Sequence, residues 1–354
     1  MGKRDQLVLA NRPKGNITPG ETFKLVTVPR PSEKGIPDGH VLVEALYLSM
    51  DPAMRGWLDD RRSYIPPVKI GEVMRSFTIA RVVAVAKSGV SKVKQGDIVT
   101  CMLGIQEVGI LPESQVEKPY PIAPGSGLKL SDLVGVLGIT GLTAYFGMEK
   151  IGKVKPGDTV VVSAAAGATG SVAAQLAKMA GAKRVIGIAG GEEKCRLLKE
   201  ELGLDVALDY KAKDFRQKLK EATPDFVDVF FDNVGGEILD LVLSRANKFA
   251  RFVICGGISQ YNSTEHQGPG KYFFNVITQR IRVEGFVVTD YVEEWPAATA
   301  KLAKWVSEGK LKRRETLVRG GIKAAEGALQ LLFDGKNVGK VVVEVKNPDE
   351  VAKL

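Results

Sequence analysis

Residues 159–170, TVVVSAAAGATG, constrain the possible folds more than any other segment of the chain. The β-branched run 159–162 leads directly into Ala165-x-Gly167-x-x-Gly170, and the pattern then predicts an amphipathic helix over 171–180 and a second strand over 184–189. This order is typical of a dinucleotide-binding βαβ unit, because small residues let a pyrophosphate approach the backbone amides at the helix N-terminus. Alanine replaces the first glycine of the usual fingerprint, so a plain strand-to-helix turn in another α/β protein is the alternative.

The pattern on either side of this unit predicts two domains of different class. Residues 1–130 are β-rich and punctuated by Gly and Pro, with strands expected over 24–28, 40–48, 79–86 and 97–102. A helical segment over 133–150 follows. From residue 159, strands are expected over 159–163, 184–189, 206–210, 226–233, 251–255 and 282–288, and helices over 192–202, 214–222, 237–247, 272–279 and 291–310. Six apolar strands linked by helices indicate an α/β fold with a doubly wound parallel sheet of the Rossmann type.

The last residues are expected to return to the first domain through a helix over 322–333 and a strand over 340–345. The predicted domains are therefore 1–130 together with 315–354, which is β-rich, and 131–314, which binds the dinucleotide. A chain of 354 residues that is 44% hydrophobic is long and apolar enough for two such cores.

Charge and cysteine usage limit the partners and the compartment. The net charge is +9, from 50 Lys and Arg against 41 Asp and Glu, and a basic surface favours phosphorylated cofactors, RNA or anionic membranes. The basic residues are interleaved with acidic ones, so no nucleic-acid partner is expected. Three scattered cysteines indicate a reducing compartment. The sequence contains no apolar run of about 18 residues, so no membrane-spanning helix is expected.

The end of the second strand of the βαβ unit predicts which nicotinamide cofactor binds. That strand ends in Gly190-Gly191, without the carboxylate that accepts a hydrogen bond from the ribose of NAD, and Lys194 and Arg196 follow within a helical turn. Glycines beside a cation suit a 2′-phosphate and point to NADP(H). Glu192 and Glu193 weaken this prediction, and Lys194 as an ordinary surface lysine is the alternative.

The sequence does not predict a metal site. Only His40 and His266 are present, and neither Gly-His-Glu nor Cys-x-x-Cys accompanies them, so the donors for a catalytic or structural zinc ion are missing.

Seven motifs, taken in order, resemble one family. They are Met50-Asp-Pro-Ala-Met-Arg55, Tyr64-Ile-Pro-Pro67 with Gly71-Glu-Val-Met74, Gly141-Leu-Thr-Ala-Tyr145, Ala164-Ala-Ala-Gly-Ala-Thr-Gly170, Asp232-Asn-Val-Gly-Gly236, Cys255-Gly-Gly-Ile-Ser-Gln-Tyr261 and Gly335-Lys-Asn-Val-Gly-Lys340. Nearly end to end, the chain resembles the zinc-independent medium-chain reductases of the prostaglandin reductase, or leukotriene B4 12-hydroxydehydrogenase, type, which include plant alkenal and bacterial curcumin reductases. This resemblance implies a Rossmann-type sheet with a GroES-like β-rich catalytic domain. One departure is Arg75-Ser76-Phe77, where the family often continues with glycines.

The resemblance also assigns cofactor contacts. Gly167, Ala168, Thr169 and Gly170 would hold the pyrophosphate, and Lys194 and Tyr210 the 2′-phosphate. Asn233 would lie beside the nicotinamide half, and Asn337 would reach back to the cofactor. The nicotinamide would be lined by Cys255, Gly256, Gly257, Ile258, Ser259, Gln260, Tyr261, Phe286, Val287 and Val288.

The implied activity is reduction of the C=C bond of α,β-unsaturated aldehydes and ketones, with hydride delivered from NADPH to the β-carbon and a proton to the α-carbon. Tyr261 is the first candidate to orient the carbonyl and supply the proton, and Tyr64 is the second; a purely cofactor-binding role and a packed aromatic are the respective alternatives. Competing functions are a quinone reductase, an NADP-dependent secondary alcohol dehydrogenase, and a non-catalytic NADPH- or RNA-binding protein.

Partners and location are also predicted. We expect a small-molecule substrate, no membrane association, and a homodimer, which the resemblance implies with 282–288 as the edge. The expected compartment is the cytoplasm, with the peroxisome as the alternative because Ala352-Lys353-Leu354 resembles the Ser-Lys-Leu import signal.

Overall fold

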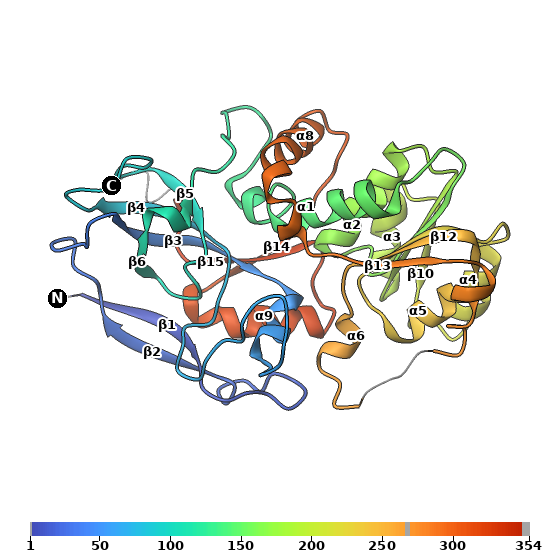
Figure 1. The fold of residues 1–354 in the computed structure, drawn as a ribbon, viewed down its shortest axis with the longest axis horizontal. Helices are drawn as coiled ribbons and strands as arrows, with labels where there is room; N and C mark the ends of the chain where they lie inside the picture. Colours follow the sequence, from blue (N-terminus) through green and yellow to red (C-terminus); the bar gives the residue numbers. More distant parts are fainter. Residues whose placement is uncertain (1, 266–269, 349–354) are drawn as a thin grey trace. The chain divides into compact units, whose positions relative to one another are not determined.

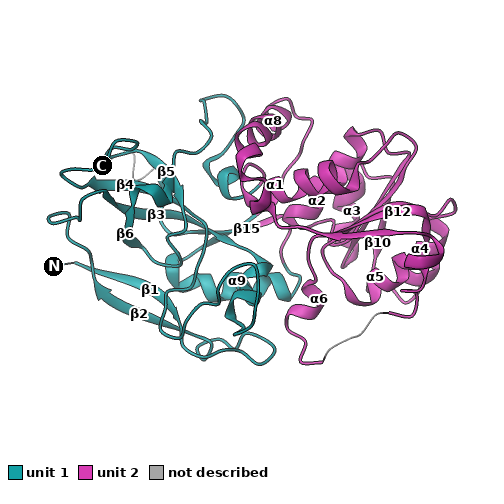
Figure 2. Ribbon diagram, in the orientation of Figure 1, with its two compact units in different colours: residues 1–135, 316–336, 341–354 teal, residues 136–315, 337–340 magenta. Residues whose placement is uncertain are grey.

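The computed structural model describes residues 2–265 and 270–348. His266 and the C-terminal tripeptide 352–354 therefore lie outside the described residues. The chain divides into two compact units, coloured separately in Figure 2. Unit 1 comprises residues 1–135, 316–336 and 341–354, and unit 2 comprises residues 136–315 and 337–340.

Unit 2 is built on a six-stranded sheet with the order β10-β9-β8-β11-β12-β13 (Figure 1). The strands are β8 Thr159–Val162, β9 Arg184–Ala189, β10 Val206–Asp209, β11 Val227–Asp232, β12 Ala246–Ile254 and β13 Arg282–Gly285. Every neighbouring pair in this order is parallel. In chain order this is 3-2-1-4-5-6, which confirms the doubly wound Rossmann sheet.

Apolar residues on both faces of the sheet explain why helices cover both. On one face Val161, Ile186 and Phe230 pack against α4 (Phe215–Ala222) and α5 (Gly236–Leu243). The other face is contacted by α2 (Ala168–Met179) and by α3 (Glu192–Glu200), whose Leu198 lies against Gly187. Because both faces of these strands are buried, their sequences are continuous apolar runs. Their positions could therefore be predicted from the sequence.

Unit 1 is built on two antiparallel β-structures. One is a seven-stranded sheet in which β3 (His40–Met50) pairs antiparallel with β4 (Thr78–Val85), β6 (Val108–Pro112) and β15 (Lys340–Glu344). The strands β5 (Ile98–Cys101), β7 (Val116–Glu117) and β14 (Glu315–Arg319) complete it. The other is the pair β1 (Lys3–Leu9) and β2 (Phe23–Pro29), joined from Lys3 opposite Pro29 to Leu9 opposite Phe23.

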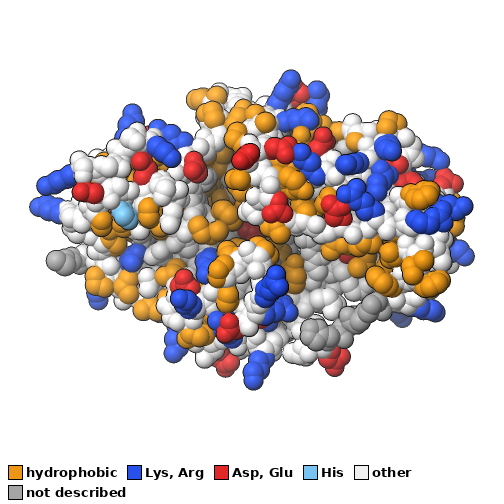
Figure 3. All heavy atoms as spheres, viewed as in Figure 1, with side chains coloured by type: hydrophobic (Ala, Val, Ile, Leu, Met, Phe, Trp, Pro, Cys, Tyr) orange, Lys and Arg blue, Asp and Glu red, His pale blue; other side chains and the backbone are white. Residues whose placement is uncertain are grey.

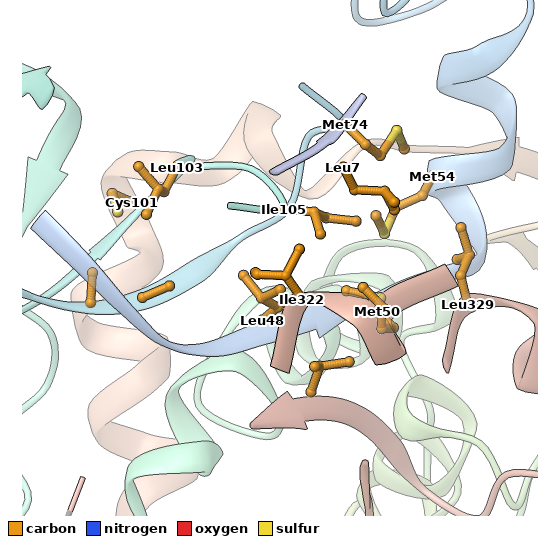
Figure 4. Close-up of a cluster of buried hydrophobic side chains, with 14 of the residues drawn as sticks. Leu7, Leu48, Met50, Met54, Met74, Cys101, Leu103, Ile105, Ile322 and Leu329 are labelled. Carbon is orange, nitrogen blue, oxygen red and sulfur yellow. The ribbon is translucent and has the colours of Figure 1, made fainter. Parts of the chain in front are cut away.

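The core of unit 1 brings together segments from both ends of the chain. Figure 4 shows Leu7 of β1, Leu48 and Met50 of β3, and Ile322 and Leu329 from the C-terminal part gathered in one apolar cluster. Leu329 belongs to α9 (Ala325–Phe333), which the sequence predicted from its apolar periodicity. The burial of these side chains keeps residues 316–336 attached to the N-terminal β-structure.

Several predicted elements have different bounds in the structure. The helix expected over 237–247 ends at Leu243, because Ala246 already pairs with Val227 as the first residue of β12. The helix expected over 272–279 is reduced to α7, Asn275–Thr278, and the one expected over 291–310 is α8, Trp295–Ser307. At Ala246, strand pairing therefore overrides local helix propensity.

Two further predicted elements are present with other bounds. The strand expected over 282–288 ends at Gly285, and the chain leaves the sheet so that the ring of Phe286 packs at Gly147. The helical segment expected over 133–150 contains only α1, Ile139–Phe146, as regular α-helix, followed by a π-turn over Gly147–Gly152. A Cβ at Gly147 would lie 2.7 Å from the Phe231 ring, so only glycine fits there.

Candidate functional site

The predicted pyrophosphate turn lies between β8 and α2 in unit 2. Gly167 is the N-cap of α2, and no side chain caps the helix N-terminus. A Cβ at Gly170 would lie 2.4 Å from the Ala164 carbonyl oxygen, and Ala164 itself has a φ of 48°. The tight turn therefore requires a glycine at 170 and leaves the amides at the start of α2 without a side-chain acceptor, an arrangement that suits an anion.

Gly167 also receives the short C-terminal segment of unit 2. Gly339 forms a parallel bridge with Gly167 and donates its N–H to the Ala166 carbonyl at 2.8 Å. The Asn337 side chain donates to the Gly339 carbonyl at 3.0 Å. The structure thus brings Asn337 and the glycine turn together, although 170 residues separate Gly167 from Asn337 in the sequence.

The second strand-to-helix turn holds two cations beside an aromatic ring. The Tyr210 ring and the Lys211 chain both lie over Gly190, where a Cβ would come within 2.8 and 3.1 Å of them. The Lys211 ammonium is 5.9 Å from the centre of the Tyr210 ring. Burial and the nearby charge of Lys211 lower the pKa of Lys194. Lys194 and Lys211 therefore bring two positive charges to this turn, which suits a multivalent anion.

Asp209, the acidic residue beside this turn, has its carboxylate bound to backbone N–H groups. Asp209 ends β10 and accepts hydrogen bonds from the backbone N–H groups of Gly191 and Lys211, both at 2.9 Å. These hydrogen bonds hold the pKa of Asp209 below its usual value. The carboxylate therefore shapes the turn and brings Lys211 beside Gly190.

Asn233 lies at the carboxyl end of β11, where a buried carboxylate organises the chain. Asp232 is fully buried and accepts hydrogen bonds from the Ser163 hydroxyl at 2.8 Å and from the backbone of Val234 and Gly235. Asn233 donates from its side chain to the Ser163 carbonyl at 2.7 Å. Burial raises the pKa of Asp232. This network fixes the ends of β8 and β11 against each other.

The predicted nicotinamide segment 255–261 is attached to the same network. Cys255 and Gly256 donate their N–H groups to the Asp232 carbonyl at 2.9 and 3.0 Å, and Ile258 donates to the Asn233 carbonyl at 3.2 Å. Burial, with a contribution from Asp232, raises the pKa of the Cys255 thiol to about 12, so the thiol is neutral at physiological pH. The segment then forms the single turn α6, Ile258–Tyr261, which also contains Ser259 and Gln260.

The Tyr261 hydroxyl is held over its own loop. It accepts a hydrogen bond from the Gly257 N–H at 3.2 Å, and a Cβ at Gly256 would lie 3.1 Å from it. The two glycines therefore make room for the phenol and orient it.

The last predicted nicotinamide residues, 286–288, follow β13. The Phe286 ring lies at Gly147, Val287 is the N-cap of the following 3₁₀-helix, and Val288 is buried with its carbonyl accepting from the Trp295 indole at 3.1 Å.

Tyr64, the second catalytic candidate, belongs to unit 1. The indole N–H of Trp57 donates to the Tyr64 hydroxyl at 2.8 Å, and Trp57 is only 6% exposed. The Tyr64 residue is 59% exposed, so the ring faces solvent while the hydroxyl end is anchored. Partial burial of that end raises the pKa of Tyr64, which keeps the phenol protonated.

Comparison with known proteins identifies the family. Residues 5–118 match a family model described as the N-terminal domain of oxidoreductase, and residues 168–304 match one described as zinc-binding dehydrogenase. The NADPH-dependent curcumin reductase of Escherichia coli (strain K12) is 40% identical over 97% of each chain. The NADP(+)-dependent 2-alkenal reductase of Nicotiana tabacum is 39% identical over 88% of this chain and 89% of its own.

A solved structure agrees with these relatives. CurA from Vibrio vulnificus in complex with NADPH has a TM-score of 0.89 and 39% identity over 97% of this chain and all of its own. The chain belongs to the zinc-independent medium-chain reductase family of the prostaglandin, alkenal and curcumin reductases.

In this reductase, the residues that sequence reasoning missed are Lys211, Asp232 and Ser163. Lys211 directly follows Tyr210 at the end of β10, and the carboxyl ends of neighbouring parallel strands meet at one edge of a sheet. That rule could have predicted Lys211 beside Gly190. Within residues 2–265 and 270–348, no three His, Cys, Asp or Glu side chains group closely enough to hold a metal ion, and no helix is long and apolar enough to cross a membrane.

Proposed function

We propose that this reductase uses NADPH to reduce the C=C bond of α,β-unsaturated aldehydes and ketones. Its membership of a family of NADP-dependent oxidoreductases supports this assignment, as do the names of the curcumin and alkenal reductases it resembles. The observation that carries the proposal is the cationic turn in which Lys211 lies over Gly190 and its charge acts on Lys194, because such a turn suits the 2′-phosphate that distinguishes NADPH from NADH.

The residues of unit 2 fit NADP(H). Gly167 to Gly170 would bind the pyrophosphate through the amides at the start of α2, and Lys194, Tyr210 and Lys211 would bind the 2′-phosphate. The Asn233 amide, the segment 255–261, residues 286–288 and Asn337 would contact the nicotinamide half. When bound, NADPH supplies the hydride that reduces the β-carbon.

Tyr261 is the proposed donor of the proton. Its hydroxyl oxygen accepts a hydrogen bond from the Gly257 N–H, which orients the phenol within the loop. A neutral phenol stabilises negative charge that develops on a carbonyl oxygen and can pass its proton onward. Tyr64 is the second candidate, since its anchored hydroxyl remains protonated.

Two variants separate these tyrosines. We expect Y261F to lower kcat for an enone by about 100-fold, the range of a positioned acid or base, while the Kd for NADPH changes by less than about twofold. We expect Y64F to have the smaller effect on kcat. Equal and small effects of both variants would assign the proton to water.

Turnover tests the reaction itself. Oxidation of NADPH is followed by absorbance with an enal, an enone, a quinone and no acceptor, and formation of NADPH is followed with a secondary alcohol and NADP⁺. We expect turnover with the enal and the enone. Turnover with the quinone alone, or no turnover with any acceptor, contradicts the proposal.

The reductase also presents a free sheet edge, and we propose that it pairs two copies. β13 is the last strand of the sheet, Val283 in it is 43% exposed, and Ile277 nearby in sequence is 68% exposed. An exposed edge strand is a template for pairing, and in β13 the apolar contact would be Val283, because Arg282 and Glu284 form an ion pair with each other. Light scattering should give twice the 38.2 kDa of one chain, and V283K should shift the mass to one chain. A wild-type mass of one chain contradicts this proposal.

The two units take the proposed roles of substrate domain and cofactor domain, unit 1 being the GroES-like β-rich part and unit 2 the dinucleotide-binding part. The proposed location is the cytoplasm. Lys and Arg are mixed with Asp and Glu over the face shown in Figure 3, which supports a small-molecule substrate rather than a nucleic acid.

A further inference from the structure

The side chain of Arg75 joins two separate parts of unit 1. Its guanidinium donates to the carbonyl oxygen of Pro66 and, at 3.3 Å, to that of Pro67, and it lies 3.7 Å from the Glu72 carboxylate. Only 20% of the Arg75 side chain is exposed. These two prolines end the segment 60–67, which we call the Tyr64 loop.

The backbone on either side of Arg75 is held by the core. Met74 is fully buried, donates to the Leu7 carbonyl at 2.9 Å and accepts from the Ile105 N–H at 2.7 Å. On the other side, the buried Ser76 hydroxyl donates to the Ser49 carbonyl at 2.9 Å. The backbone at Arg75 is therefore fixed to the core on both sides. For this reason, the hydrogen bonds of the Arg75 side chain restrain the loop.

The chemistry of the Tyr64 loop explains why an arginine suits this position. Pro66 and Pro67 have no backbone N–H, so their backbone offers acceptors only. A planar guanidinium presents several donors in a fixed fork that matches two adjacent carbonyls, whereas the donors of a lysine lie on one flexible point charge and a glycine has no side-chain donor. The Trp57 indole N–H also donates to the Tyr64 hydroxyl, and directly after the loop the Val68 N–H donates to the Trp57 carbonyl, each at 2.8 Å.

We propose that Arg75 is a positioning residue that locks the Tyr64 loop and thereby restricts the size of the enals and enones that the enzyme accepts. This inference rests on the proposed function for its substrate class. Arg75 holds the two carbonyls that follow Ile65, and Tyr64 is the exposed aromatic of the loop. Without the guanidinium, the loop loses its anchor at Pro66 and Pro67 and samples open positions there, although Tyr64 stays bonded to Trp57 and Ile65 still packs against the core.

Limited trypsin digestion tests whether Arg75 restrains the Tyr64 loop, and it does so without measuring enzyme activity. Arg61, Arg62 and Lys69 are exposed cleavage sites in or next to the loop. We expect R75A to accelerate cleavage after Arg61 and Arg62 about tenfold, the effect of losing charge-assisted hydrogen bonds. R75K should lie between R75A and wild type. The matched control is R319A, which removes an exposed arginine paired with Glu344 in the same unit.

Steady-state kinetics with a short enal and a bulky aryl enone test the consequence for specificity. In R75A we expect KM for the short enal to rise and the ratio of kcat/KM, bulky over short, to increase by about fivefold or more, with the Kd for NADPH unchanged. R75K supplies the same comparison if R75A does not fold.

Two results overturn the inference: wild-type digestion rates in R75A, or an unchanged size preference in a variant whose loop is cleaved faster. A wild-type enzyme that reduces no enal or enone contradicts the proposed function instead, and the digestion result still decides whether Arg75 locks the loop.

Discussion

Lys194 and Lys211 are the residues on which cofactor choice depends. Each carries its charge close to the other, at a turn whose glycines leave room for a phosphate, and the Asp209 carboxylate is occupied by backbone amides. A dianionic 2′-phosphate would relieve the repulsion between the two ammonium groups, whereas the neutral hydroxyl of NADH would not.

Substitution of either lysine should therefore act on NADPH selectively. We expect K211A and K194A each to weaken NADPH binding by about tenfold or more and to leave NADH binding nearly unchanged, because a charge-assisted hydrogen bond to the phosphate is lost. The measurement is the Kd for both cofactors by fluorescence titration at fixed salt concentration. K183A is the control, since Lys183 precedes β9 at its opposite end and pairs with Asp225. Equal losses for NADPH and NADH would refute this account of the turn.

At the scale of elements, Glu44 joins three segments of unit 1. It lies in β3, is 3% exposed, and forms ion pairs with Arg30 after β2, Arg81 of β4 and Lys346 after β15. Burial alone would raise the pKa of Glu44, but its hydrogen bonds and charge interactions with Lys346 and Arg30 lower it. The ionised carboxylate is therefore a stabilising part of the sheet.

Removing this carboxylate should destabilise unit 1. We expect E44A to lower the free energy of unfolding by about 3 kcal/mol, because three cations lose a buried partner. The control E344A, at the surface pair with Arg319, should change it by about 1 kcal/mol or less. Since the folded pKa lies below the unfolded one, the contribution of Glu44 is present above the unfolded pKa and is lost as pH falls through the folded pKa. Chemical denaturation from neutral to acidic pH measures it, and equal pH dependence of E44A and wild type would contradict it.

Some strands and helices could be predicted from the sequence and others could not. The strands of the parallel sheet were predictable because runs such as 159–162 are apolar on both faces and are bounded by glycine turns. β1, KRDQLVL, begins with polar residues and is recognisable only through its pairing with β2, and β14 was missed in the same way. The hydrogen bonds from Arg75 to Pro66 and Pro67 could not be predicted, because that proximity is not a property of local sequence, whereas the position of Lys211 beside Gly190 follows from the meeting of neighbouring strand ends.

At the scale of the whole molecule, the chain divides into two compact units, and its sequence lacks the Gly-His-Glu and Cys-x-x-Cys motifs of a zinc site. Treatment with phenanthroline followed by gel filtration should leave kcat/KM for an enone unchanged, because the protein groups proposed for catalysis are phenols and backbone amides. Loss of activity that returns on adding Zn²⁺ would show that the assignment of a zinc-independent reaction is wrong.

The central claim is transfer of a hydride to the β-carbon of a conjugated C=C bond. The most direct measurement uses NADPH that carries deuterium on the transferred position of the nicotinamide, an enone, and product analysis by mass spectrometry and NMR. The account predicts a saturated ketone with deuterium on the β-carbon and a solvent-derived hydrogen on the α-carbon. An allylic alcohol with deuterium on the former carbonyl carbon would contradict it.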